Sequence, residues 1–244
     1  MQMSIYDTLI NSNDTMNKRI YGVLIGVVTN NQDPEKLGRV KVKIPVRECQ
    51  SETYWARVAT LMAGNSRGSF FLPEVNDEVL VAFCEGDIRQ PYVIGTLWNA
   101  QDKPPEENAD GKNNIRKIKS RSGHEIILND EKSKEKVTVK SSKGHTILLD
   151  DEAGGKINIK DKSGKNSVTI DCASNTITLS SDAKIEIKAK SCKVEIDGMS
   201  SSVNVESSGQ LKLKGASVNI ESSGMMNIKS SGMLAIKGSM VKIN

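Results

Sequence analysis

The second half of this 244-residue chain carries a repeat that few folds can accommodate. Short apolar–polar–apolar triplets begin at residues 137 and 157, and from Val168 onwards they recur every seven to nine residues. Each triplet predicts a short β-strand whose two apolar side chains share one face, because residues i and i+2 of a strand point the same way. All nine aromatic residues precede residue 99 and all six prolines precede residue 106, so the chain divides into two kinds of structure.

Two inward side chains per strand are too few for a two-layer sandwich, but they can fill a narrow three-walled prism of strands stacked about 4.7–4.9 Å apart. Either a single-chain parallel β-helix or three intertwined chains would satisfy this pattern. A core without aromatic residues or a capping element favours three chains, since an uncapped solenoid exposes sheet edges. The residues predicted to form the trimer core are Val168, Ile170, Ile177, Leu179, Ile185, Ile187, Val194, Ile196, Val203, Val205, Leu211, Leu213, Val218, Ile220, Met226, Ile228, Leu234 and Ile236.

The first half alternates apolar and polar residues in five short runs and contains no long helical pattern. Five short strands over about 80 residues are typical of a small barrel such as an OB-fold. The sequence therefore predicts an all-β chain in which an OB-fold barrel precedes a trimeric, intertwined triple-stranded β-helix. The predicted strands are 21–28, 38–45, 54–59, 78–83 and 92–97, and the predicted divisions are an N-terminal arm or helix at 1–19, the barrel at 20–98, a linker at 99–114 and the β-helix at 115–244.

Composition argues against several other classes. The net charge of +4 divides into −3 for residues 1–115 and +7 for residues 116–244. The lysines of the basic half alternate with apolar residues and have no aromatic stacking platforms beside them, so we expect no nucleic-acid partner. No apolar run approaches the roughly 20 residues that span a bilayer, and the first ten residues lack the basic and apolar regions of a signal peptide. Cys49, Cys84, Cys172 and Cys192 show no metal or redox spacing, which predicts reduced structural thiols in a protein made in the cytoplasm.

No enzyme motif is present, so we expect no catalytic residues, no metal ligands and no cofactor. His124 and His145 each follow a glycine in two similar segments 21 residues apart, which predicts equivalent turn or strand-start positions. A metal site formed by one histidine from each of three chains is the alternative. Acidic neighbours such as Asp150 and Asp151 would point to opposite faces of a strand, unlike the facing carboxylates of a glycosidase.

Several segments together resemble a known family. Gly26-Val27-Val28, Asp33-Pro34, Gly38 to Val42, Trp55 to Val58, Pro73 to Phe83 and Gly86 to Gly95 resemble its OB module, and Ser120 to His124 with the octads resembles its β-helix. The family is the central spike of contractile injection machines, comprising phage baseplate assembly protein V and the spike part of type VI secretion VgrG. The resemblance covers residues 20 to 244.

The resemblance implies a non-enzymatic homotrimer whose OB barrels dock on a baseplate hub and whose spike pierces the target cell envelope. About 20 residues precede the OB module, so the hub would be a separate protein, which favours a phage tail, tailocin or phage-like particle over a type VI apparatus. The particle would be assembled in the bacterial cytoplasm and be extracellular after release. The alternatives are a type VI spike with a separate hub, a single-chain β-helix enzyme acting on polysaccharides, and an OB-fold nucleic-acid binder with a stalk.

The last residues predict a further partner. Three copies of the final strand would leave a blunt end with unpaired backbone groups, which is open to strand-like pairing. We therefore expect a PAAR-like tip protein to dock there. The predicted docking residues are Met240, Val241, Lys242, Ile243 and Asn244.

Overall fold

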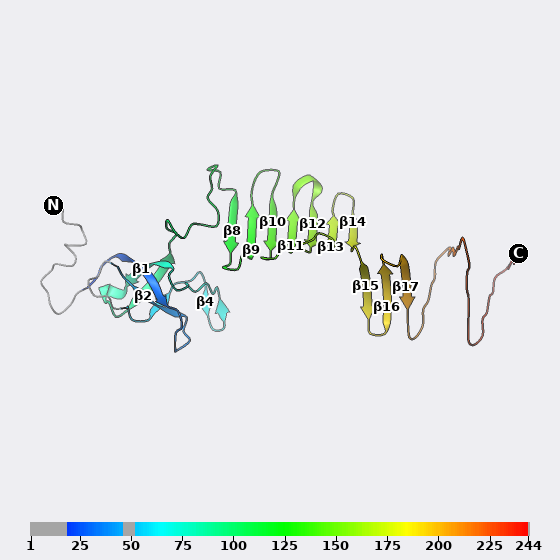
Figure 1. Cartoon of the computed structure of the whole chain (residues 1–244), viewed down its shortest axis with the longest axis horizontal. Coiled ribbons are helices and arrows are strands. Elements are labelled where there is room, and N and C mark those ends of the chain that lie inside the picture. The colour runs from blue at the N-terminus through cyan, green and yellow to red at the C-terminus, as the bar shows by residue number, and fades with distance from the viewer. Residues whose placement is uncertain (1–18, 46–51, 244) are drawn as a thin grey trace. The chain divides into compact units, whose positions relative to one another are not determined.

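The computed structural model describes residues 19–45 and 52–243 (Figure 1). The chain divides into two compact units, residues 1–119 and residues 120–244. Apart from Arg19, the arm or helix predicted at 1–19 lies outside the described residues. None of the helices among the described residues is long and apolar enough to cross a bilayer.

The first unit contains a closed five-stranded barrel in the order β1-β2-β3-β7-β6. Neighbouring strands pair antiparallel except β3 and β7, which run parallel. All five predicted strands and the barrel are confirmed. The strands of the barrel are β1 (Val23–Asn30), β2 (Arg39–Lys43), β3 (Ala56–Val58), β6 (Glu78–Phe83) and β7 (Pro91–Thr96).

Strict alternation explains the barrel core. In β6 every second residue is buried, and the same period places alternate residues of β2 inside the barrel. Valine dominates this interior, because a β-branched side chain packs well on a pleated surface. The buried core consists of Val28, Val40, Val42, Ile44, Ala56, Val79, Val81, Phe83 and Val93.

Asp33 organises the loop between β1 and β2. Its carboxylate accepts hydrogen bonds from the backbone N–H groups of Glu35 and Leu37 at 3.0 and 2.9 Å. Arg39 adds two side-chain bonds, from Nε at 2.9 Å and from Nη2 at 2.8 Å. The Arg39 guanidinium also lies 6.0 Å from the ring centre of Trp55, the residue that precedes β3. The Asp33-Pro34 and Gly38-Arg39 motifs therefore act as one structural unit.

This loop carries a pH prediction. The hydrogen bonds from Arg39 are the main reason that the pKa of the Asp33 carboxyl lies far below its ordinary value. Since the folded pKa is depressed, the stabilisation is fully present above the ordinary pKa of about 4 and is lost as the pH falls below it. An Asp33→Asn variant should be less stable than the wild type near pH 7, and the difference should shrink below about pH 4. Urea unfolding followed by tryptophan fluorescence measures the free energy of unfolding of both proteins. An equal difference near pH 7 and below about pH 4 would contradict the prediction.

Two short elements complete the first unit. The hairpin of β4 (Ala63–Gly64) and β5 (Arg67–Gly68) was not predicted, and a 3-10 turn, η1 (Cys84–Gly86), follows β6. Residues flanking the hairpin are highly exposed, with Phe70 and Phe71 at 79% and 70%. Residues 99–114 contain no strand.

The repeat forms two sheets of consecutive strands, a seven-stranded sheet with its strands between residues 115 and 180 and a three-stranded sheet between residues 184 and 206 (Figure 1). Strands from β9 to β14 pair in chain order and antiparallel, as do β15 to β17. A single-chain parallel β-helix would instead pair strands in parallel, one circuit apart. The strands are β8 (Ile115–Lys119), β9 (Glu125–Asn129), β10 (Lys136–Lys140), β11 (Thr146–Asp150), β12 (Lys156–Lys160), β13 (Ser167–Asp171), β14 (Thr176–Ser180), β15 (Lys184–Ala189), β16 (Cys192–Asp197) and β17 (Ser202–Glu206), with a 3-10 turn η2 (Glu152–Gly154) between β11 and β12.

The five predicted strands after residue 210 do not form ladders within the chain, since residues 207–243 contain no strand. The spacing of the triplets also changes along the repeat. Between 126 and 168 they start ten or eleven residues apart, which leaves five or six residues for a hairpin turn between five-residue strands. After 203 the interval falls to seven or eight residues, which leaves two or three residues between strands of that length. Turns this short are compatible with hairpins, as the two-residue turn between β15 and β16 shows, so these segments are distinguished by their missing strand partners and not by their spacing.

Candidate assembly surface

One face of the seven-stranded sheet is apolar from strand to strand. The register places Val137 beside Leu128 and Leu149, and Val139 beside Ile126 and Ile147. Continuing this register gives two unbroken rows. The rows are Leu128–Val137–Leu149–Ile157–Ile170–Ile177 and Ile126–Val139–Ile147–Ile159–Val168–Leu179.

The opposite face of the same sheet is mostly polar. Thr169 Oγ1 donates to Asn158 Oδ1 at 2.9 Å, and Lys156 Nζ lies 3.1 Å from Asp171 Oδ2. The backbone amide of Ser174 and Lys156 together lower the pKa of the Asp171 carboxyl. This face is thus satisfied within one chain, whereas the apolar face has no such cover.

The exposed fractions show how little one chain covers the apolar rows. Six of their side chains, on β9 to β12, are between 41% and 47% exposed, and Ile177 on the last strand is 73% exposed. Nearly half of the surface of each of these six side chains is therefore open to solvent in the single chain. A continuous exposed apolar face of this length is characteristic of a surface that binds another protein chain.

The three-stranded sheet repeats the arrangement. Ile185, Ile196 and Val203 form one apolar row, and Ile187, Val194 and Val205 form the other. Ile185 also lines a surface hollow together with Ile147, Ile159, Val168 and Leu179 of the first sheet. One hollow therefore borders apolar residues of both sheets.

The polar face of this second sheet holds a compact charge cluster. Glu195 is 9% exposed, and its Oε2 lies 3.0 Å from Lys193 Nζ and 3.2 Å from Lys184 Nζ. These two ammonium groups lower the pKa of the Glu195 carboxyl, Lys193 more strongly. The flanking lysines offset the repulsion between Glu195 and Glu186, which are direct cross-strand partners.

The equivalence predicted for His124 and His145 is confirmed by their turns. In each turn the histidine N–H donates to a serine Oγ four residues earlier at 3.0 Å, and the preceding glycine has a φ near +90°. Ser142 N–H also donates to His124 Nδ1 at 3.2 Å, which connects the two turns. Among the described residues no group of three or more histidine, cysteine or acidic side chains could hold a metal ion.

The apolar rows include residues that sequence reasoning missed. The predicted trimer core began at Val168, yet Ile126, Leu128, Ile147 and Leu149 extend the same rows towards β9. Apolar central residues concealed the alternation in these strands, in Ile126-Ile127-Leu128 and Ile147-Leu148-Leu149. The spacing could have revealed it, since Ile126 and Ile147 lie eleven and ten residues before the triplets at 137 and 157. The predicted core residues from Leu211 to Ile236 are exposed in the single chain, between 45% and 72%.

The described cysteines are exposed, whereas the sequence predicted structural thiols. Cys84, Cys172 and Cys192 are free thiols and are exposed, because each lies just outside the barrel core or at the end of a strand. Cys192 Sγ lies 3.6 Å from Ser207 Oγ. Cys49 lies outside the described residues.

Barrel and repeat together define a class of protein: an all-β chain in which a small closed barrel precedes short strands with one continuous apolar face. Comparison with known proteins shows what this arrangement is similar to. Residues 24–98 match the model of the type VI secretion system and phage-baseplate injector OB domain. This match and the relatives below support a similarity to the baseplate and VgrG spike family.

Three relatives illustrate the similarity. Type VI secretion system spike proteins VgrG4b and VgrG5 of Pseudomonas aeruginosa are 35% and 32% identical over 134 residues, which is 50% of this chain and 17% of each relative. Spike protein VgrG3 of Vibrio cholerae is 35% identical over 95 residues, 36% of this chain and 9% of that protein. The chain thus spans less than a fifth of the length of these relatives.

Proposed function

We propose that this protein is a structural, non-enzymatic spike of a contractile injection apparatus and that it works as a homotrimer. The two uncovered apolar rows carry the proposal. Three copies arranged around one axis would turn their rows inward and form a dry prism, while the polar faces stay in water. Residues 207–243 would find strand partners in the other two copies, and so complete the ladders that one chain leaves open.

The comparisons support the same role from the barrel end. The matched OB family is shared by type VI secretion systems and phage baseplates, and the relatives above are named as type VI spike proteins. The proposal therefore covers a phage, tailocin or phage-like baseplate and, equally, a type VI apparatus with a separate hub. In each, the barrels would dock on a baseplate hub, the particle would be assembled in the bacterial cytoplasm, and the spike would contact the target envelope. Docking of a tip protein at Met240–Asn244 stays a prediction.

The mass in solution tests the proposal. Light scattering on the purified full chain should give about 80 kDa, three times the 26.6 kDa of one chain. Because the apolar rows drive association, the mass should not depend on moderate salt. A monomer at micromolar concentration would contradict the proposal and would favour a single-chain module.

The polysaccharide-enzyme alternative predicts a different result. Such an enzyme would act as a monomer and would need a groove with facing carboxylates about 5–9.5 Å apart. The antiparallel pairing of β9 to β14 differs from the parallel coil on which that alternative rests. Hydrolysis of peptidoglycan by the purified protein, lost when one acidic residue is replaced, would favour the alternative.

A further inference from the structure

The turns of the seven-stranded sheet lie alternately at the two sides where its strands begin and end, because the strands form consecutive antiparallel hairpins. One of these sides, here called the basic edge, consists of the turns at 120–124, 141–145, 161–166 and 181–183. The opposite side, here called the acidic edge, consists of the turns at 130–135, 151–155 and 172–175.

The two edges carry opposite net charge. The turns of the basic edge contain four lysine or arginine residues and two aspartates, whereas those of the acidic edge contain five acidic residues and two lysines. The strand ends at the basic edge add to its positive charge, since they carry three lysines, Lys119, Lys140 and Lys160, and one acid, Glu125. The strand ends at the acidic edge carry two lysines and two aspartates, so their charges cancel. Charged turn residues are Arg121, Lys143, Asp161, Lys162, Lys165 and Asp182 on the basic edge, and Asp130, Glu131, Lys132, Lys134, Glu135, Asp151 and Glu152 on the acidic edge.

Some of these charges pair within one chain. Lys165 pairs with Asp182 at 3.2 Å on the basic edge, and Lys134 pairs with Glu131 at 2.8 Å on the acidic edge. Lys143 and Lys162 are exposed, and within the described part of the chain neither has a carboxylate within ion-pair distance.

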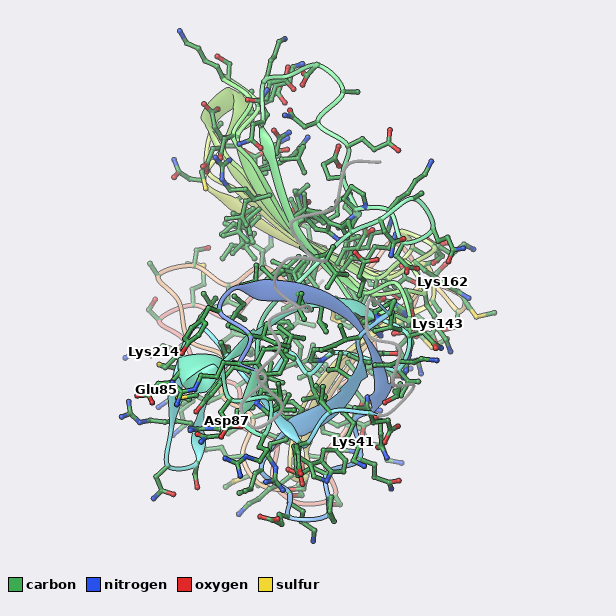
Figure 2. All side chains as sticks on the ribbon, turned by 90° about the vertical axis from the view of Figure 1, so that its left-hand side faces the viewer. Lys41, Glu85, Asp87, Lys143, Lys162 and Lys214 are labelled. Atoms are coloured by element: carbon green, nitrogen blue, oxygen red, sulfur yellow. The ribbon has the colours of Figure 1, made fainter. Side chains whose placement is uncertain are left out.

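The turns of Lys143 and Lys162 are neighbours on the edge. A Cβ built on Gly144 would lie 3.4 Å from Lys162 Cβ, and Figure 2 labels both lysines. On the acidic edge, Asp151 and Glu152 are exposed and form no ion pair with a described lysine or arginine, although Glu152 contributes to the raised pKa of Lys134. Each edge therefore holds charges that form no ion pair within the described part of one chain.

Threefold symmetry brings these edges together. Around a cyclic axis every contact is heterologous, so the basic edge of one copy meets the acidic edge of the next. Rotation about the threefold axis does not change the position of a residue along that axis. If the strands run across the axis, successive turns lie at successive positions along it, on alternating edges. The turn at 151–155 of one copy therefore lies between the turns at 141–145 and 161–166 of its neighbour.

From this geometry we propose that the corners of the trimer are closed by ion pairs between copies, in which Lys143 and Lys162 of one chain bind Asp151 and Glu152 of the next. The inference rests on the trimer proposed above and assigns the surface between its walls. Apolar rows alone permit two or three copies to associate in several registers, whereas charge complementarity at the corners selects one order and one register. The partner of each edge is a second copy of this chain.

Charge reversal on either edge tests the proposal with the full-length trimer. Lys143→Glu with Lys162→Glu should lower the midpoint of thermal trimer loss by about 5 °C at low salt, since each exposed pair contributes little but three corners are affected. Asp151→Lys with Glu152→Lys should do the same. The fourfold exchange should restore most of the midpoint, because the corner pairs reform with opposite sign. Urea can bring the transition into range without adding ions.

Lys132→Glu is the matched control. It makes one such lysine-to-glutamate change on a turn of the acidic edge, so it should not lower the midpoint, whereas Lys143→Glu or Lys162→Glu alone should lower it. In about 1 M NaCl the losses of both double variants should largely disappear, because the Debye length falls to about 3 Å. Circular dichroism before heating checks that every variant has the wild-type strand content.

The outcomes separate this proposal from the proposed function. If every variant stays trimeric with the wild-type midpoint, or if the fourfold exchange is no better than the double variants, the corner pairs are overturned and the trimer stands. The same holds if Lys132→Glu lowers the midpoint as much as reversal on the basic edge does. A monomeric wild-type protein would overturn the proposed function itself.

Discussion

Replacing Ile177 by aspartate should abolish the trimer. In one chain this side chain is 73% exposed, so the substitution should leave the fold of the single chain unchanged. In the trimer three copies of the residue would lie in a dry prism. Losing three buried isoleucines costs roughly 5–9 kcal/mol at about 1.5–3 kcal/mol each, and the desolvation of three carboxylates adds to this. Light scattering should show a mass near that of one chain.

Thr178→Asp is the matched control, since Thr178 is the next residue on the same strand and points to the polar face. It places the same charge in water and should leave the trimer intact. Ile187→Asp in the second sheet should behave like Ile177→Asp, because Ile187 belongs to the apolar row of that sheet. A trimeric, heat-resistant Ile177→Asp protein would show that the rows are not the buried axis.

Replacing Gly26 by alanine should destabilise the barrel. A Cβ at this position would overlap Val42 Cγ1, and the Lys43 carbonyl oxygen would lie 3.2 Å away. Both neighbours belong to β2, and Val42 is fully buried, so neither can move aside easily. Overpacking of this kind costs about 1–3 kcal/mol. Both tryptophans lie before residue 99, so fluorescence reports unfolding of this half of the chain.

Gly95→Ala provides the control within the same barrel. Gly95 lies on β7, and a Cβ there would have no atom within 4 Å. Its stability should stay within about 0.5 kcal/mol of the wild type, as is usual for an open surface position. Equal losses in both variants would mean that the strand backbone, and not the contact with Val42, makes glycine necessary.

The barrel was predictable because its strands alternate without interruption. Glu78 to Phe83 places valine, valine and phenylalanine on one side, and the predicted strand agrees with β6 at both ends. The β4–β5 hairpin was not predictable in this way. Its strands are two residues long and contain glycine, so neither period nor propensity marks them.

The repeat was predictable in its strands but not in their pairing. A triplet such as Val168-Thr169-Ile170 determines which side chains share a face, and the structure confirms that face. The triplets do not determine which strand lies beside it, because a hairpin can close over two residues, as between β15 and β16, or over six, as between β12 and β13. The antiparallel pairing of β9 to β14 therefore could not be read from the triplets, and residues 207–243 contain no strand although their triplets follow the same pattern.

The consecutive hairpins of β9 to β14 make the response to force depend on its direction. Hydrogen bonds between neighbouring strands lie along the direction in which the strands are stacked. A pull along this direction would load one hairpin after another, so the sheet would unzip strand by strand. A push instead presses every strand against the next and breaks no bond until the stack buckles. Such a sheet would resist compression better than tension, an asymmetry that suits the spike proposed above.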